Sequence, residues 1–163
     1  MSGPARATAP SGPHVRIRTA HPADAPVIAD LLDQLGYPQG DEERTADRIQ
    51  DWAEDPSSVA FVAVADGPPI GVIAVHVSPF FEQDGSWGRI VAVVVADRAR
   101  RHGVGARLVA AAEAFATSRG CLRMEVTSGD RRPEAHEFYR RRGYVDQAGT
   151  SSRFVRDLPG PGH

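Results

Sequence analysis

The stretch GRIVAVVVADRARRHGVGARL, residues Gly88 to Leu108, decides the fold that we expect for the whole chain. It begins as an apolar, β-branched run from Ile90 to Val95, which is typical of a central strand buried on both faces. It ends as an amphipathic helix that starts at Val104. The residues of that helix expected to face the core recur in steps of four, three and four: Val104, Leu108, Ala111 and Phe115.

A glycine-rich turn, Arg100 to Ala106, connects this strand to this helix. Glycine lets the backbone come close to a ligand, and the first amides of a helix have no partner within the helix. Such a turn is typical of an anion site. The turn has neither the Gly-Lys-Ser/Thr of a triphosphate loop nor the full dinucleotide spacing Gly-x-Gly-x-x-Gly.

What remains is Arg-x-x-Gly-x-Gly, formed by Arg100, Gly103 and Gly105. This pattern resembles the pyrophosphate loop of the GNAT superfamily of N-acetyltransferases, which bind acetyl-coenzyme A. Asp97 stands where proline is frequent in that family, and Arg101 where glycine is frequent. The resemblance implies the following coenzyme-binding residues: Val93, Val94, Val95, Arg100, Arg101, His102, Gly103, Val104, Gly105 and Ala106.

A second motif, Ala135 to Tyr144, resembles the late helix of the same family, Ala-x-x-Phe-Tyr-x-x-x-Gly-Phe/Tyr. In that family the tyrosine faces the coenzyme sulfur, which implies this role for Tyr139. Arg132 stands where an asparagine is common, and we assign it to the coenzyme site as well. Either motif alone also fits a structural explanation, for example a core aromatic pair before a glycine helix stop. Both motifs in this order favour the family.

The resemblance implies one α/β domain, with a mixed central sheet that splays between the fourth and fifth strands and is flanked by helices. We expect this domain at residues 14–157, a disordered tail at 1–13 and a short tail at 158–163. The expected strands are Val15–Arg18, Val59–Ala65, Ile70–Val77, the central strand and Cys121–Val126, then a closing hairpin of Tyr144–Gln147 with Ser152–Arg156. The expected early helices run from Pro22 to Gly36 and from Asp41 to Glu54.

The composition indicates an ordinary globular protein with a formal net charge of -2. No apolar run approaches the ~20 residues of a membrane span, and no secretory signal begins the chain, so we expect a cytoplasmic protein. The single cysteine, Cys121, excludes an internal disulfide, and the histidines lack metal-ligand spacing, so we expect no metal.

Acetyl transfer to an amine needs a base, a polarised carbonyl and a protonated or stabilised leaving thiolate. We assign the thiolate's acid to Tyr139, and the resemblance implies a backbone amide of Val93–Val95 for the carbonyl. Glu82 is our first choice for the base because a carboxylate in an aromatic loop should have a raised pKa. His76, His136 and a water chain stay open as bases. Cys121 is rejected as an acyl carrier because we expect it to be the first residue of a buried strand, where cysteine is mostly inert.

Charge is distributed unevenly, with carboxylates from Asp24 to Asp55 and arginines from Arg98 onward. The basic half suits the phosphates of coenzyme A, and the acidic segment favours a cationic acceptor. We therefore predict an acetyl-CoA-dependent N-acetyltransferase that acts on a small-molecule or peptide amine. A non-catalytic acyl-CoA sensor is the alternative. We expect neither a nucleic acid nor a membrane as partner, and a homodimer stays open.

Overall fold

The computed structural model describes residues 14–100, 102–127 and 133–161. The chain divides into two compact units, with the boundary between Thr127 and Ser128. The first unit carries all five strands and the second carries the last helix, α4 (Pro133–Arg141). No helix within the described ranges is both long enough and apolar enough to cross a membrane.

Five strands form one sheet in the order β1-β2-β3-β4-β5. Neighbours are antiparallel from β1 to β4, and β5 lies parallel to β4. A parallel neighbour needs a crossover, which helix α3 provides. The strands are β1 (Arg16–Thr19), β2 (Ser58–Val64), β3 (Pro69–Pro79), β4 (Ser86–Val95) and β5 (Cys121–Val126). These findings confirm the α/β fold class and the mixed sheet.

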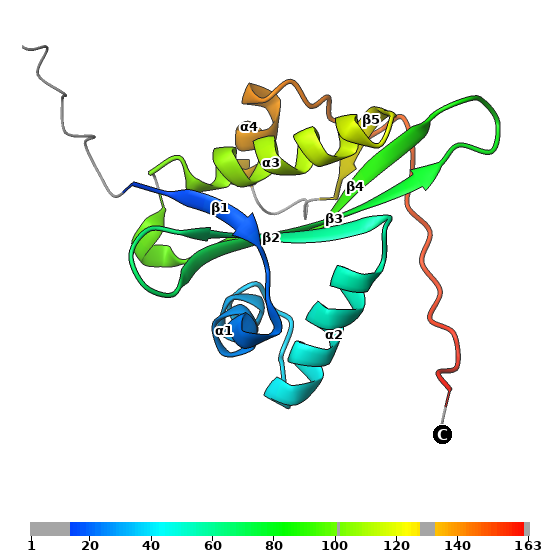
Figure 1. Cartoon of the computed structure of the whole chain (residues 1–163). Helices are drawn as coiled ribbons and strands as arrows, with labels where there is room; N and C mark the ends of the chain where they lie inside the picture. The colour runs from blue at the N-terminus through cyan, green and yellow to red at the C-terminus, as the bar shows by residue number, and fades with distance from the viewer. Residues whose placement is uncertain (1–13, 101, 128–132, 162–163) are drawn as a thin grey trace, which may run out of the picture. The chain divides into compact units, whose positions relative to one another are not determined.

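Helices cover both faces of this sheet (Figure 1). On one face lie α1 (Ala25–Gln34), preceded by the 3-10 turn η1 (Pro22–Asp24), and α2 (Glu42–Glu54). Their apolar side chains join those of β2, β3 and β4 in a buried cluster that includes Ile28, Leu31, Val62, Val72 and Val94.

Helix α3 (Val104–Ser118) lies on the opposite face, after the short 3-10 turn η2 (Asp97–Ala99). Two buried glycines allow it to lie close to the sheet. A Cβ atom at Gly71 would be 3.1 Å from Leu108 Cδ1, and one at Gly88 would be 3.2 Å from Ala116 Cβ. The buried stripe of α3 begins as predicted at Val104 and Leu108. It continues through Val109, Ala112 and Ala116, whereas Ala111 and Phe115 are only partly buried.

The predicted closing hairpin is wrong. No strand follows β5 among the described residues, and residues 145–161 are exposed, with Phe154 94% accessible. Asp146 instead accepts a hydrogen bond from the Ala148 amide and starts a turn. Two short strands are marginal without a buried face, and this segment buries none of its apolar side chains. Cys121 also differs from expectation, since it is half-buried in a β5 strand whose Leu122 is 71% accessible.

Candidate functional site

Strand β4 changes its pairing halfway along its length. Ala74 pairs with Ala92 and Val75 with Ile90, so Val91 is an extra residue that forms a bulge. On the other side, the ladder to β5 ends where Ile90 pairs with Val126. Residues 91–95 of β4 therefore have no β5 partner, which is the predicted separation of the fourth and fifth strands.

This open edge presents backbone groups of the predicted coenzyme residues. The Ala96 amide donates to the Ile70 carbonyl at 2.8 Å, so Ala96 is in hydrogen-bonding register with β3. Because this register alternates along an antiparallel ladder, Val94 also bonds β3 while Val93 and Val95 face the open edge. The amides and carbonyls of Val93 and Val95 are thus available to a ligand.

The glycine turn leads from this edge into α3. Gly103 is the N-cap of α3 in the left-handed conformation, with φ 74° and no side-chain cap. The first backbone hydrogen bond of α3 runs from the Arg107 amide to the Gly103 carbonyl. The amides of Val104, Gly105 and Ala106 therefore donate to no described residue, and a Cβ at Gly103 would meet no atom within 4 Å. An open ring of amides at a helix N-terminus fits a pyrophosphate.

Two side chains of the turn lie at the surface. Arg100 is exposed and forms an ion pair with Asp97, Nη2 to Oδ1 3.0 Å, and His102 is exposed as well. The predicted coenzyme residues Arg101 and Arg132 lie outside the described residues.

A pocket of about 480 Å³ opens between the C-terminal part of α2 and strands β2, β3 and β4. Its walls combine carboxylates, aromatic rings, a histidine and an arginine: Asp51, Trp52, Asp55, Ser58, His76, Ser78, Trp87, Arg89 and Val91. We call it the histidine pocket. The negative charges and tryptophan faces suit an ammonium group.

A second pocket, of about 710 Å³, lies beside the link between α1 and α2. Its walls include two arginines of α2: Leu32, Tyr37, Pro38, Gln39, Gly40, Asp41, Arg44, Arg48, Val91 and Ala92. We call it the arginine pocket. Val91, the bulge residue, lines both pockets, so the two meet on β4 next to its open edge.

Three residues of the histidine pocket form a hydrogen-bonded chain. Ser58 Oγ donates to Asp55 Oδ2 at 2.9 Å and lies 2.8 Å from His76 Nδ1. The Ser57 amide also donates to Asp55 Oδ1, at 2.9 Å. These two donors lower the pKa of Asp55, so its carboxyl group stays ionised at neutral pH.

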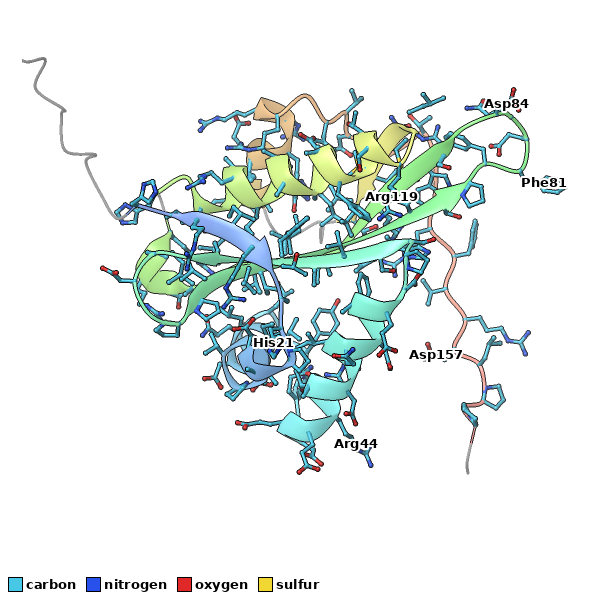
Figure 2. All side chains as sticks on the ribbon, in the orientation of Figure 1. His21, Arg44, Phe81, Asp84, Arg119 and Asp157 are labelled. Carbon is cyan, nitrogen blue, oxygen red and sulfur yellow. The ribbon has the colours of Figure 1, made fainter. Side chains whose placement is uncertain are left out.

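Glu82, our first choice for the base, lies in the loop between β3 and β4. Figure 2 shows this loop reaching out from the sheet, with Phe81 and Asp84 at its tip. Glu82 is exposed and accepts a hydrogen bond from the Phe81 amide at 3.1 Å. It lines neither pocket, so its role stays a prediction.

In the second unit, Tyr139 is partly buried on α4 among other aromatic rings. Its ring centroid lies 5.1 Å from that of Phe138 and 5.7 Å from that of Tyr144. Burial raises the pKa of Tyr139, because a phenolate is poorly solvated there. The phenol therefore stays protonated at neutral pH, as a proton donor must.

Sequence reasoning missed most of the pocket residues. Ser58 and Trp87 carried no motif, and Asp51 and Asp55 were noted only as part of an acidic run. One signal was present: Arg44, Arg48 and Asp51 of α2 and Asp55 at its C-cap recur in steps of four, three and four, the spacing of one helix face. Among residues 14–100, 102–127 and 133–161, no three His, Cys, Asp or Glu side chains gather as a metal site would require.

The sequence matches the acetyltransferase (GNAT) family over residues 26–144. It is 29% identical to the aminoalkylphosphonate N-acetyltransferase of Salmonella typhimurium over 133 residues, which cover 81% of this chain and 86% of that protein. The fold is similar to glucosamine-6-phosphate N-acetyltransferase from Arabidopsis thaliana, with TM-score 0.75, 22% identity, and 88% and 99% of the two chains covered. An aminoglycoside N-acetyltransferase in complex with coenzyme A gives TM-score 0.75 at 19% identity, with 93% and 99% covered.

Proposed function

Because the chain belongs to the acetyltransferase (GNAT) family, we propose that it transfers the acetyl group of acetyl-CoA to the primary amine of a small molecule. Membership of the family confirms the predicted enzyme class, an acetyl-CoA-dependent acetyltransferase. The single observation that carries the proposal is the position of the histidine pocket, which reaches Val91 just where β4 loses its β5 partner.

The residues present fit the coenzyme. The amides of Val104, Gly105 and Ala106 would hold its pyrophosphate, and the open backbone of Val93 and Val95 would hold its extended arm. The bound coenzyme supplies an acetyl thioester, whose carbonyl carbon is the electrophile. In the second unit, the protonated Tyr139 supports its predicted role as donor to the leaving sulfur.

The charge pattern of α2 supports an acceptor with two different ends. Asp51 and Asp55 line the histidine pocket, whereas Arg44 and Arg48 line the arginine pocket on the same helix face. No carboxylate of the described residues forms an ion pair with either arginine. We propose that the amine enters the histidine pocket while a phosphonate, phosphate or carboxylate of the same molecule binds the arginines.

The names of two similar proteins support this acceptor class, since aminoalkylphosphonates and glucosamine 6-phosphate each carry an amine and an anionic group. Our prediction of a purely cationic acceptor is the second candidate. The acidic segment from Asp24 to Asp55 favours it, and one structural neighbour acetylates aminoglycosides.

Acetyl-CoA turnover, followed by release of free thiol, separates the two candidates. The acceptors are an aminoalkylphosphonate, the alkylamine without its phosphonate, and a polyamine. Arg44→Gln and Arg48→Gln should each raise KM for the phosphonate about ten-fold, because each removes a charge-assisted contact. They should leave turnover of the plain alkylamine unchanged. Arg16→Gln, which removes an exposed arginine of β1, is the matched control and should change neither.

If a polyamine is the best substrate and its turnover is the same in both arginine variants, the cationic candidate is supported instead. Absence of thiol release with every amine would contradict the proposed function itself.

A further inference from the structure

The hydrogen bonds of the Asp55, Ser58 and His76 chain specify where its protons lie. An ionised carboxylate only accepts hydrogen bonds, so Asp55 Oδ2 takes the hydroxyl proton of Ser58 across 2.9 Å. A serine hydroxyl has one proton, so Ser58 Oγ must accept in its contact with His76 Nδ1 at 2.8 Å. His76 therefore carries its proton on Nδ1, and the lone pair of the neutral ring lies on Nε2.

We infer that His76 is the general base of the acetyl transfer, with Ser58 and Asp55 as positioning residues that keep its Nε2 available to accept a proton. The inference rests on the proposed function. It names a base that the sequence left open among Glu82, His76 and His136.

The register of the sheet places His76 in the wall of the histidine pocket. Ser58 on β2, His76 on β3 and Arg89 on β4 are consecutive partners across the sheet, so they form one row on the face that carries α2. Val91 lies two residues beyond Arg89, at the start of the open edge of β4. The row that contains His76 therefore lies two residues before the open edge of β4.

Charged groups face His76 from two elements. From α2 and its C-cap come the carboxylates of Asp51 and Asp55, and from β4 comes the guanidinium of Arg89. Arg89 is held by a hydrogen bond from Nη2 to Thr127 Oγ1 at 2.9 Å. The carboxylates favour the imidazolium that forms when the base accepts a proton, and the guanidinium favours the neutral base before it does.

The proton and electron balance of the step is complete without another reactant. The acceptor ammonium gives one proton to His76 Nε2, and the freed nitrogen lone pair forms the new C–N bond. The C–S bond of the thioester breaks, and its electron pair leaves on sulfur, which takes up a proton. The second amine proton leaves as the amide forms and balances the proton that sulfur takes up, and His76 then releases its proton to solvent. The bond from His76 Nδ1–H to Ser58 is kept in both protonation states, so the ring need not turn.

The first test measures the tautomer of His76 directly and requires no acceptor. Proton–nitrogen correlation spectra of the imidazole rings should show His76 as the Nδ1–H tautomer in the wild type at a pH where it is neutral. Ser58→Ala should shift it towards Nε2–H, and Ser58→Thr, which keeps a hydroxyl, should restore it. An Nε2–H tautomer in the wild type would overturn the inference.

The second test is the pH profile of turnover with the best acceptor. His76→Gln should lower kcat about 10²-fold and remove the fall in rate on the acid side of the profile. Ser58→Ala should lower kcat about ten-fold and keep that limb, and Ser58→Thr should recover most of the rate.

Two substitutions control this experiment. Asp51→Asn removes a carboxylate from the same pocket without touching the chain, so it should raise KM while the acid limb, which His76→Gln removes, remains present. Glu82→Gln tests the rival base, and the acid limb should persist in this variant if His76 is the base. Loss of the acid limb in Glu82→Gln, with its retention in His76→Gln, would overturn the inference while the proposed function stands. No turnover with any amine would count against the proposed function alone, because the tautomer is measured separately.

Discussion

The glycine turn after β4 and the two pockets beside β4 offer two different kinds of binding surface. The turn is seven consecutive residues, Arg100 to Ala106, and offers backbone amides at a helix N-terminus. The pockets are built from residues of α1, the link to α2, α2, β2, β3 and β4, and the chain from Asp55 through Ser58 to His76 spans two strands and a helix end. Under the proposed function, coenzyme recognition is local and depends on the backbone, whereas acceptor recognition is dispersed and depends on side chains.

The strongest test of this contrast is a charge placed in the turn. Gly103→Glu should abolish coenzyme binding, with a loss of more than about 100-fold in affinity, because a carboxylate would lie over the amides that bind phosphate. Gly103→Gln is the matched control, since it has the same size and the same strain at φ 74° without the charge. Calorimetry with coenzyme A measures both. Equal losses would mean that the left-handed backbone, rather than the charge, is what matters.

A smaller effect is expected at Tyr139, which lies in the second unit and belongs to neither region. Tyr139→Phe should lower kcat about 10²-fold with little change in coenzyme affinity, because the ring remains and only the donor is lost. Burial raises the pKa of Tyr139 above its ordinary value of about 10, so the donor form should persist, and loss of this donor should cause no alkaline fall in wild-type kcat until the pH exceeds that value.

Tyr144→Phe removes a hydroxyl from the ring next to Tyr139 and should leave kcat unchanged. An unaltered rate in Tyr139→Phe would assign protonation of the thiolate to water or to another group.

The contrast also explains how much the sequence could predict. The turn and the β4 strand were predictable because strand, glycines and helix are consecutive, and their physics depends on φ angles and unpaired amides. The pockets were not, because no spacing rule connects Asp55, Ser58 and His76 before the register of the sheet is known.

Charge counting was a weak guide for a related reason. The arginines after residue 98 were taken together as a coenzyme surface, yet several make structural contacts of their own. Arg107 donates a hydrogen bond to the Val15 carbonyl, and Arg119 donates one to the Pro56 carbonyl. Each bond connects α3 or its C-cap to another part of the first unit. Arg141 pairs with Glu137 along α4. The closing hairpin failed because its two short segments have no buried face to stabilise them.

The helix layer that carries the pockets depends on an ion pair, which predicts an acid-sensitive stability. Arg18 on β1 donates to both carboxylate oxygens of Asp24 at 2.8 and 2.9 Å, and the His21 amide donates to the same carboxylate at 2.8 Å. The bond to Arg18 is the main reason that the pKa of Asp24 is lowered. Asp24→Asn should reduce the free energy of unfolding by about 2 kcal/mol.

The sign with pH follows from the lowered pKa. The folded state binds this proton less readily than the unfolded state, so the contribution is present above the ordinary carboxyl pKa and is lost as pH falls through the folded value. Urea denaturation between neutral pH and about pH 3 measures it. The difference in free energy of unfolding between wild type and Asp24→Asn should become smaller as the pH falls. Arg18→Gln should show the same narrowing, whereas Arg16→Gln should not. A difference that stays constant with pH would mean that Asp24 acts through packing.

The smallest expected change in coenzyme A affinity tests whether the turn binds its ligand through backbone amides alone. Arg100 pairs with Asp97 at 3.0 Å, and both side chains are largely exposed, so the pair contributes little to stability. Asp97→Asn releases Arg100 towards a phosphate and should tighten coenzyme A binding by about two-fold at low salt, an effect that high salt should remove. Arg100→Gln should weaken binding by a similarly small factor. Both variants leave the amides of Val104, Gly105 and Ala106 in place, so calorimetry on them isolates the side-chain contribution. A change of ten-fold or more in either variant would contradict the contrast, because the turn would then recognise its ligand through charged side chains as the pockets do.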